Sequence, residues 1–439
     1  MGMHHASWHG TRNREQPLPR DWAVFAILVA LMIVDYADRQ VVVSMFSHLR
    51  EQWHLTDRQL GALVSVVSIT VAVGALPLSL LADRWSRVRS IFLMALIWSL
   101  ATIGCAFAGS YAHLLGARAI VGLGEAAYGT VGVALLATLF PSRMRSTVLG
   151  AFLAASMIGS LLGVVLGGVI AERWGWQAGF GVVGVPGLLL AMLLVVVADE
   201  DRPPELPERA SERNRTRLRD LVHELMSPRS IPIACLGAGL QLLAVSTIYA
   251  WLPTYLHRYY GYAPDRAGLQ AAIVVLAGGL GAVTWSAVAD RLTARNRSAR
   301  LLVPASVAIG TALVLSPTLA LVPVGPLQFS LLVAGGLLMA GTIGPVAAAV
   351  VDVTPQHLRA TASAVLAVTQ NLIGLAGGPL LTGALSDRYG LSMAMAIVPL
   401  ACLPAAALFL LAARWYSRDI DCARESGSRD HPLPAPGPT

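Results

Sequence analysis

The fold class of this chain is decided by the stretch Met32-Ile33-Val34-Asp35-Tyr36-Ala37-Asp38-Arg39-Gln40-Val41-Val42. The stretch lies inside the first long apolar segment, residues 22–46, and a transmembrane helix needs about 20 mostly apolar residues. It places two carboxylates and one guanidinium at bilayer depth, where a charge costs at least ~2.5 kcal/mol. Such residues face a protein interior or a water-filled cavity, and they are functional candidates for that reason.

Helical spacing brings these charges together. Asp35 precedes Asp38 by three residues and Arg39 by four, so all three share one face of a helix. We interpret this face as part of a solute pathway.

The composition of the whole chain agrees with a membrane protein. Of its 439 residues, 55% are hydrophobic and 13% are charged, whereas soluble domains carry about 25% charged residues. We therefore expect an all-α polytopic membrane protein and not a soluble enzyme. Segments of spanning length predict twelve transmembrane helices: residues 22–46, 58–81, 90–108, 112–139, 146–170, 176–197, 231–256, 266–289, 301–322, 327–351, 358–385 and 392–413.

A polar stretch, Ala198–Arg229, divides the predicted helices six and six. Within it, Leu218, Leu221, Val222 and Leu225 have the spacing of a short amphipathic helix on the membrane surface, although a polar connector explains them equally well. The expected organisation is an N-terminal tail (1–21), a six-helix bundle (22–197), a central loop (198–230), a second six-helix bundle (231–414) and a C-terminal tail (415–439).

The distribution of Arg predicts the orientation. The two tails and the loops after even-numbered spans hold 24 Arg, and the opposite loops hold six. Because Arg and Lys accumulate in cytoplasmic loops, we expect a multi-pass protein of the cell (inner) membrane with both termini cytoplasmic.

The two halves of the chain repeat one another at offsets of 207 to 215 residues. Two similar bundles with a site between them near the bilayer midplane are the plan of many secondary transporters. The repeated pairs are Asp57-Arg58 with Asp265-Arg266, Asp83-Arg84 with Asp290-Arg291, Pro141/Arg145 with Pro355/Arg359, Gly159/Gly163 with Gly374/Gly378, and Arg173-Trp174-Gly175 with Arg388-Tyr389-Gly390.

These matched positions resemble the major facilitator superfamily over nearly the whole chain. The loop from Ser79 to Arg89 is similar to the signature loop of that superfamily, with Ser79 and Ser86 where Gly is usual. The resemblance implies a cytoplasmic latch between the halves; plain positive-inside topology is the alternative. The latch residues would be Asp83, Arg84, Arg87, Arg145, Asp290 and Arg291.

The fourth span, with Asp38-Arg39 of the first, resembles spinster-like facilitators. It contains Arg118 and Glu125 seven residues apart, on one face, followed by Tyr128. Asp35 stands where the family pattern often has Asn, which adds a carboxylate. The resulting candidates for proton coupling and the substrate pathway are Asp35, Asp38, Arg39, Arg118, Glu125 and Tyr128.

The fifth span carries Gly159, Gly163, Gly167 and Gly168. This spacing is similar to the glycine motif of antiporters, with Val164 where that motif has Pro. Glycines allow close helix contact, and simple packing without any role in coupling is the alternative interpretation.

Asp38, Arg39, Arg118 and Glu125 predict proton-coupled alternating access. Burial raises the pKa of a carboxyl group and a neighbouring Arg lowers it, so an acid that gains and loses an Arg partner binds and releases a proton. Either Glu125 or Asp38 could be the coupling acid. The alternative is a permanent salt bridge that fixes helix packing.

The second half offers few charges, and its possible substrate contacts are Gln241, Tyr249, Gln370 and Asn371. One charged half and one apolar half suit an amphipathic solute. The family resemblance implies a lysolipid or sphingoid-type lipid, and a drug is also possible. An organic-anion:proton symporter is the alternative, and a non-transporting membrane sensor is a further one.

Enzymatic activity is not expected. The chain has no Gly-x-Ser-x-Gly motif, no His-Glu-x-x-His motif and no Lys for a phosphate-binding loop. We expect no cofactor, no metal and no nucleic acid, and a monomer whose partners are its solute, protons and the lipid bilayer.

Overall fold

The computed structural model describes residues 17–198, 228–355 and 358–429. All of the regular structure within these ranges is helical. The first half contains α1 (Pro19–Ser44), α2 (Phe46–Trp53), α3 (Asp57–Arg84), α4 (Arg87–Ala106), α5 (Tyr111–Glu125), α6 (Tyr128–Leu139), α7 (Ser142–Trp174) and α8 (Trp176–Val197). The second contains α11 (Ser230–Tyr260), α12 (Pro264–Thr293), α13 (Ala299–Leu321), α14 (Pro326–Met339), α15 (Ile343–Asp352), α16 (Arg359–Thr369), the π-helix η1 (Gln370–Leu375), α17 (Gly377–Tyr389), α18 (Leu391–Ile397), the 3₁₀-helix η2 (Val398–Ala401) and α19 (Cys402–Arg429).

The predicted all-α membrane fold is confirmed. Among the described residues, eleven helices or in-line helix groups are long and apolar enough to cross a membrane. The twelfth span is α1, which is 26 residues long and carries the charged stretch that lowers its apolar character. The central amphipathic helix predicted around Leu218–Leu225 lies outside the described residues.

Repeated glycines end two of the long helices. Gly175 after α7 and Gly390 after α17 both have φ +82°, a backbone region that residues with a side chain rarely adopt. They are equivalent positions of the sequence repeat, and each lets the chain turn directly into the next helix. Thr56 caps α3 by accepting a hydrogen bond from the Gln59 amide.

Three of the predicted spans contain interruptions that the sequence did not indicate. The fourth span is broken into α5 and α6 around Ala127 (φ −121°, ψ 1°), and the tenth is broken into α14 and α15. The eleventh contains a π-helix, which inserts one extra residue per turn. The breaks in the fourth and tenth spans lie beside Ala, Gly and other small or apolar residues, so the hydropathy stays continuous and the sequence gives no sign of them.

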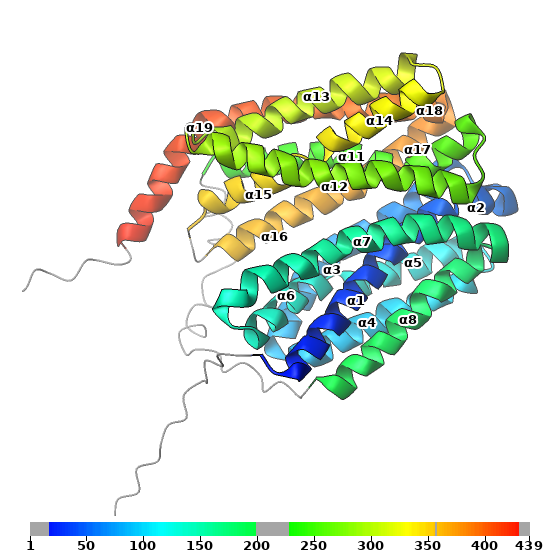
Figure 1. Ribbon diagram of the computed structural model, residues 1–439, viewed down its shortest axis with the longest axis horizontal. Coiled ribbons are helices and arrows are strands. Elements are labelled where there is room, and N and C mark those ends of the chain that lie inside the picture. The colour runs from blue at the N-terminus through cyan, green and yellow to red at the C-terminus, as the bar shows by residue number, and fades with distance from the viewer. Residues whose placement is uncertain (1–16, 199–227, 356–357, 430–439) are drawn as a thin grey trace, which may run out of the picture.

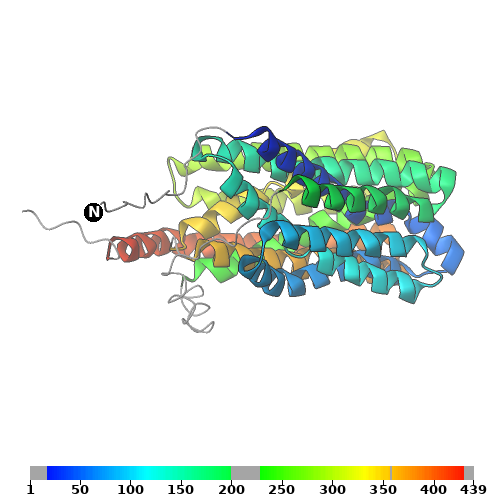
Figure 2. The same ribbon diagram turned by 90° about the horizontal axis from the view of Figure 1, so that it is seen from below.

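The helices form two groups, α1–α8 and α11–α19; α12 and α13 run close to the long axis of the molecule, whereas α1 and α8 are tilted from it (Figure 1, Figure 2). We call the end that carries α2 the α2 end, and the opposite end, where α1 and α11 begin, the tail end. The groups contact each other mainly where α3 packs on α17 and α7 packs on α12. One buried apolar cluster draws on both groups: Phe46 of α2 packs 5.1 Å from the Trp251 ring of α11.

Candidate functional site

The predicted charged residues of α1 and α5 meet inside the first helix group. Arg118 Nη1 lies 3.0 Å from Asp38 Oδ2, and it also donates to the Asp38 backbone oxygen at 3.3 Å. Neither residue is exposed to solvent, at 0% each. This ion pair joins the two helices at bilayer depth.

Arg39 forms a second, separate set of contacts. Its Nη2 lies 2.9 Å from Glu125 Oε2, and its Nε donates to Asp35 Oδ1 at 3.4 Å. Its guanidinium also lies 5.2 Å from the centre of the Tyr36 ring. The Arg39 side chain is 20% exposed, whereas the side chain of Glu125 is fully buried. Arg39 is therefore the member of this charged cluster (Asp35, Asp38, Arg39, Arg118 and Glu125) that is most accessible to a solute.

The charged cluster has three acids and two guanidiniums, so it carries one more acid than base. The Arg39–Glu125 contact is an ion pair without hydrogen-bond geometry, and the carboxyl group of Asp35 lies beside that of Glu125. An uncompensated buried charge is costly. One proton bound by the cluster would balance its charge.

Glycines of α7 bring that helix close to the charged face of α1. A Cβ at Gly159 would overlap the Ile33 carbonyl, and a Cβ at Gly163 would overlap the Ala37 carbonyl. The glycine motif therefore lets α7 pack directly against the backbone of α1, beside the pathway candidates. Whether it also has a role in coupling stays a prediction.

Tyr128 lies near Asp35 of the charged cluster, but its hydrogen bond is to the backbone of α1. Its hydroxyl donates to the Leu28 backbone oxygen at 2.6 Å, and its ring packs edge-on against Trp98, 5.3 Å away. It is 0% exposed. The structure thus places Tyr128 in the core of the first helix group, where it joins α6 to α1.

The four candidates of the second half lie in two environments. Gln241 is buried, and its Nε2 donates to the Met339 backbone oxygen at 3.0 Å, where α14 ends. Tyr249, Gln370 and Asn371 are half-buried. Asn371 Nδ2 donates to the Ala367 oxygen at 2.9 Å. Within the described residues, no hydrogen bond or ion pair joins these four to the charged cluster.

A polar contact between the halves was missed by the sequence analysis. Asp57 at the start of α3 receives a bidentate contact from Arg258 of α11, with both N–O distances at 2.7 Å. Arg50 Nη1 also donates to Asp57 at 2.6 Å, and Ser386 Oγ of α17 donates to it at 2.5 Å. The carboxylate of Asp387 accepts from the backbone amide of Asp57 at 2.8 Å, which caps α3 from the opposite half. We call these five residues the α2-end lock.

Close backbone contacts surround the α2-end lock. Gly61 of α3 lies against the Pro379 backbone, and Gly383 of α17 lies against the Asp57 backbone, so closely that a Cβ at either glycine would overlap it. The equivalent pair Gly168 and Gly268 does the same between α7 and α12. The halves are therefore tightly joined at the α2 end.

The latch residues whose side chains the structure describes show no such contact between the halves at the tail end. Arg87 Nη1 donates to the Ala134 oxygen of its own half at 3.3 Å. Asp290 pairs with Arg300 at 3.4 Å, and Arg300 pairs with Asp352 at 2.8 Å, all within the second half. Arg145 and Arg291 are exposed, and the side chains of Asp83 and Arg84 lie outside the described part. The latch stays a prediction.

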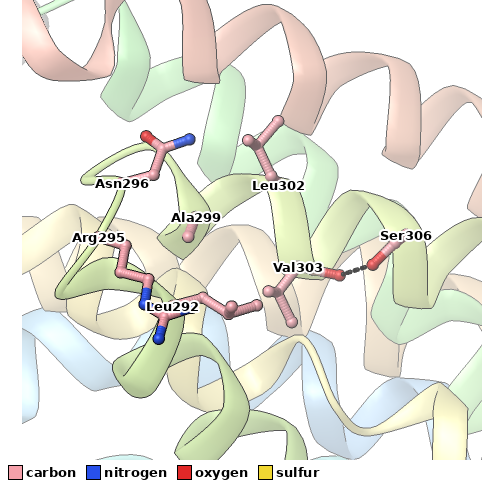
Figure 3. A pocket seen from close by; sticks show the side chains of 7 residues that line it. All are labelled: Leu292, Arg295, Asn296, Ala299, Leu302, Val303 and Ser306. Atoms are coloured by element: carbon pink, nitrogen blue, oxygen red, sulfur yellow. Dashed lines mark hydrogen bonds between the residues drawn. The ribbon is translucent and has the colours of Figure 1, made fainter.

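A shallow cavity of about 330 Å³ lies at the tail end between α12 and α13 (Figure 3). It is lined by Leu292, Arg295, Asn296, Ala299, Leu302, Val303 and Ser306. None of the predicted site residues lines it.

Comparison with known proteins agrees with this architecture. The sequence profile of the Major Facilitator Superfamily matches residues 28–378. Protein spinster homolog 1 of Xenopus tropicalis is 28% identical over 384 residues, which cover 83% of this chain and 73% of the relative. The sphingosine-1-phosphate transporter SPNS2 of Mus musculus is 25% identical over 380 residues, covering 82% of this chain and 69% of that protein.

A solved structure has a similar fold. The crystal structure of a bacterial homolog of the human lysosomal transporter spinster, in an inward-facing and unoccupied conformation, has a TM-score of 0.80 with 20% identity. The similarity covers 92% of this chain and 99% of that one. The predicted family and the predicted absence of enzymatic activity are confirmed, because the relatives are transporters. The chain therefore belongs to the Major Facilitator Superfamily, within which it is a transporter of the spinster-like type.

Proposed function

We propose that this transporter is a proton-coupled secondary transporter that moves an amphipathic organic solute, such as a lysolipid, a sphingoid-type lipid or a drug, by alternating access. The observation that carries the proposal is the charged cluster. It holds an excess acid at bilayer depth, and its most accessible member, Arg39, is paired with two of its three acids.

The coupling follows from competition for Arg39. An anionic headgroup that binds the exposed part of this guanidinium draws it away from Glu125 and Asp35. Two buried carboxylates without a cation favour uptake of a proton, because an unpaired buried charge is costly. The solute and the proton are then linked through one side chain, and the pathway residues are Asp35, Asp38, Arg39, Arg118 and Glu125.

The apolar part of the solute would contact the second half. Among the candidates there, Tyr249, Gln370 and Asn371 are half-buried and uncharged, so they suit a chain with scattered polar contacts. A lipid-like solute is also the kind of molecule in the name of the mouse relative.

Alternating access would occur by motion of the bundles 22–197 and 231–414. The α2-end lock joins the halves, while Asp290 of the latch pairs within its own half. Since the Arg distribution favours a cytoplasmic tail end, this conformation would face the cytoplasm. We place the protein in the cell (inner) membrane as a monomer with both termini cytoplasmic, and the latch would join the halves in the opposite conformation.

The test is uptake of a fluorescent lysophospholipid by proteoliposomes under an imposed pH gradient. Wild-type protein is expected to respond to the gradient, and Glu125→Gln is expected to lose that response. Glu172→Gln is the matched control, since its side chain is 48% exposed and remote from the charged cluster. An unchanged pH response in both Glu125→Gln and Asp38→Asn would refute proton coupling through this cluster.

An organic-anion:proton symporter is the second candidate, and the exposed part of Arg39 favours it as an anion site. This alternative would be selected if the protein took up a soluble organic anion, if lysolipids did not compete with that uptake, and if Arg39→Gln abolished it.

A further inference from the structure

The cavity between α12 and α13, which we call the tail-end cavity, combines charge with apolar surface (Figure 3). Its lining extends from Leu292 in the last turn of α12 to Ser306, about 10 Å along α13 from the residue where that helix begins. Ala299 and Val303 are buried, whereas Leu292 and Leu302 are exposed. The cavity is therefore an open recess with an apolar floor and apolar sides.

The polar side of the tail-end cavity is basic. Arg295 and Asn296 line it from the turn that follows α12, and both are exposed. The Asn296 side chain accepts a hydrogen bond from the Ser298 amide at 3.0 Å, which holds this turn. Arg295 forms no ion pair with any described residue, and neither does Arg291, one helical turn before it. In the described part of the chain, two guanidiniums at this end of α12 therefore have no anionic partner.

The acids that contact this segment are paired with other Arg residues. Residues 291–300 contain four Arg and no Asp or Glu. Asp290, just before the segment, contacts Arg300 at 3.4 Å, and Asp421 of α19 contacts Arg297 at 2.9 Å. The segment can therefore take a further anion without displacing an existing ion pair.

The apolar side of the tail-end cavity continues along the surface of α13. Leu302, Ile309 and Leu313 are exposed, and they share one face with Ser306 because these residues are spaced by three or four positions. In Figure 1, α13 lies along the edge of the second helix group that is remote from the first group. An exposed apolar face on a helix of spanning length contacts the acyl chains of the bilayer. The cavity is thus basic at the helix ends and apolar toward the membrane interior.

We propose that the tail-end cavity binds one anionic phospholipid of the bilayer. The phosphate accepts hydrogen bonds from Arg295, whose planar guanidinium can contact two phosphate oxygens at once, and Arg291 adds positive charge nearby. One acyl chain lies over Leu302 and follows the exposed face toward Leu313. Basic pockets between transmembrane helices suit anionic headgroups in this way. A soluble phosphate would use the charge but none of the apolar surface, so the lipid matches both sides of the cavity.

The test is native mass spectrometry of the detergent-purified full-length protein mixed with phosphatidylglycerol or phosphatidylcholine. Wild type is expected to retain one phosphatidylglycerol in preference to phosphatidylcholine. Arg295→Gln is expected to weaken phosphatidylglycerol binding about tenfold, because a contact between charged groups is lost. Arg173→Gln is the matched control, since it removes the same charge from an exposed position at the α2 end, and it should bind as wild type does.

A second pair of variants tests the apolar part of the site. Ser306→Phe fills the recess, and Ser330→Phe places the same ring at another exposed Ser whose hydroxyl also bonds within its own helix. We expect Ser306→Phe to weaken phosphatidylglycerol binding and Ser330→Phe to leave it unchanged.

Three results would overturn the proposal. The first is equal phosphatidylglycerol binding by Arg295→Gln and Arg173→Gln, and the second is equal retention of the two lipids by wild type. The third is competition by inorganic phosphate together with unchanged binding in Ser306→Phe, which would show a site for a soluble anion instead. None of these measurements involves transport, so they are independent of the proposed function.

Discussion

Replacing Asp57 with Asn is expected to open the α2 end. The change keeps the shape of the side chain but removes the charge that Arg258, Arg50 and Ser386 contact. The capping bonds from Asp387 to the α3 backbone are retained, because they do not involve the Asp57 side chain. The perturbation therefore acts on the contact between the halves more than on either half alone.

The magnitude follows from the exposure of the partners. The Arg50 side chain is 46% exposed, so its pair with Asp57 contributes about 0–1 kcal/mol. Arg258 is 24% exposed and contacts both oxygens, and a hydrogen bond to a charged group contributes about 1.5–3 kcal/mol. A net loss of about 2 kcal/mol corresponds to a shift of about 30-fold toward the open α2 end.

The assay is a spin-label distance distribution across the α2 end, with labels at the exposed positions Glu51 and Arg388. Cys422 is replaced first, since it is exposed while Cys105, Cys235 and Cys402 are buried. Asp57→Asn is expected to increase the long-distance population strongly, and the control Arg50→Gln only slightly. Equal distributions for wild type and Asp57→Asn, or equal opening in both variants, would refute the role of the α2-end lock.

The remaining predictions concern the charged cluster and its supports. Arg118→Gln leaves Asp38 buried without a cation and is expected to lower the free energy of unfolding by about 3–5 kcal/mol, measured as a loss of folded protein. Arg39→Gln is expected to fold and to lose solute binding. Equal yields of folded protein for the two variants would contradict this distinction. Tyr128→Phe removes one hydrogen bond to Leu28 and is expected to cost about 1 kcal/mol in thermal unfolding with transport retained; lost transport at full stability would return Tyr128 to the pathway. Gly163→Val is expected to separate α7 from α1 and abolish folding or transport, while Gly150→Ala, which has open space, should be neutral; a functional Gly163→Val protein would show that the close packing is dispensable.

The charged cluster could be predicted because local spacing determines which residues share a helix face. Asp35, Asp38 and Arg39 lie within one turn of α1, and Arg118 and Glu125 lie two turns apart on α5. The pairing could not be predicted. Whether Arg118 meets Asp38 or Glu125 depends on the axial offset and rotation of α1 against α5, which no pattern within either helix specifies.

The α2-end lock was out of reach for a similar reason. The sequence repeat pointed to Asp57 and Arg58, but Arg258 lies 201 residues away and Ser386 lies 329 residues away. A polar residue at a helix start is ordinary, and only the packing of α3 on α17 reveals its partners. The break between α5 and α6 was missed because Ala126 and Ala127 are small and apolar, and both suit a continuous span.

The central claim is that solute binding at Arg39 drives proton uptake by Glu125. The most direct test measures proton uptake when an anionic lysophospholipid is added to purified protein in weak buffer. The account predicts proton uptake by wild type that saturates with solute binding, persists in Glu172→Gln and disappears in Glu125→Gln. Solute binding without any proton signal, or an equal signal in Glu125→Gln, would contradict it.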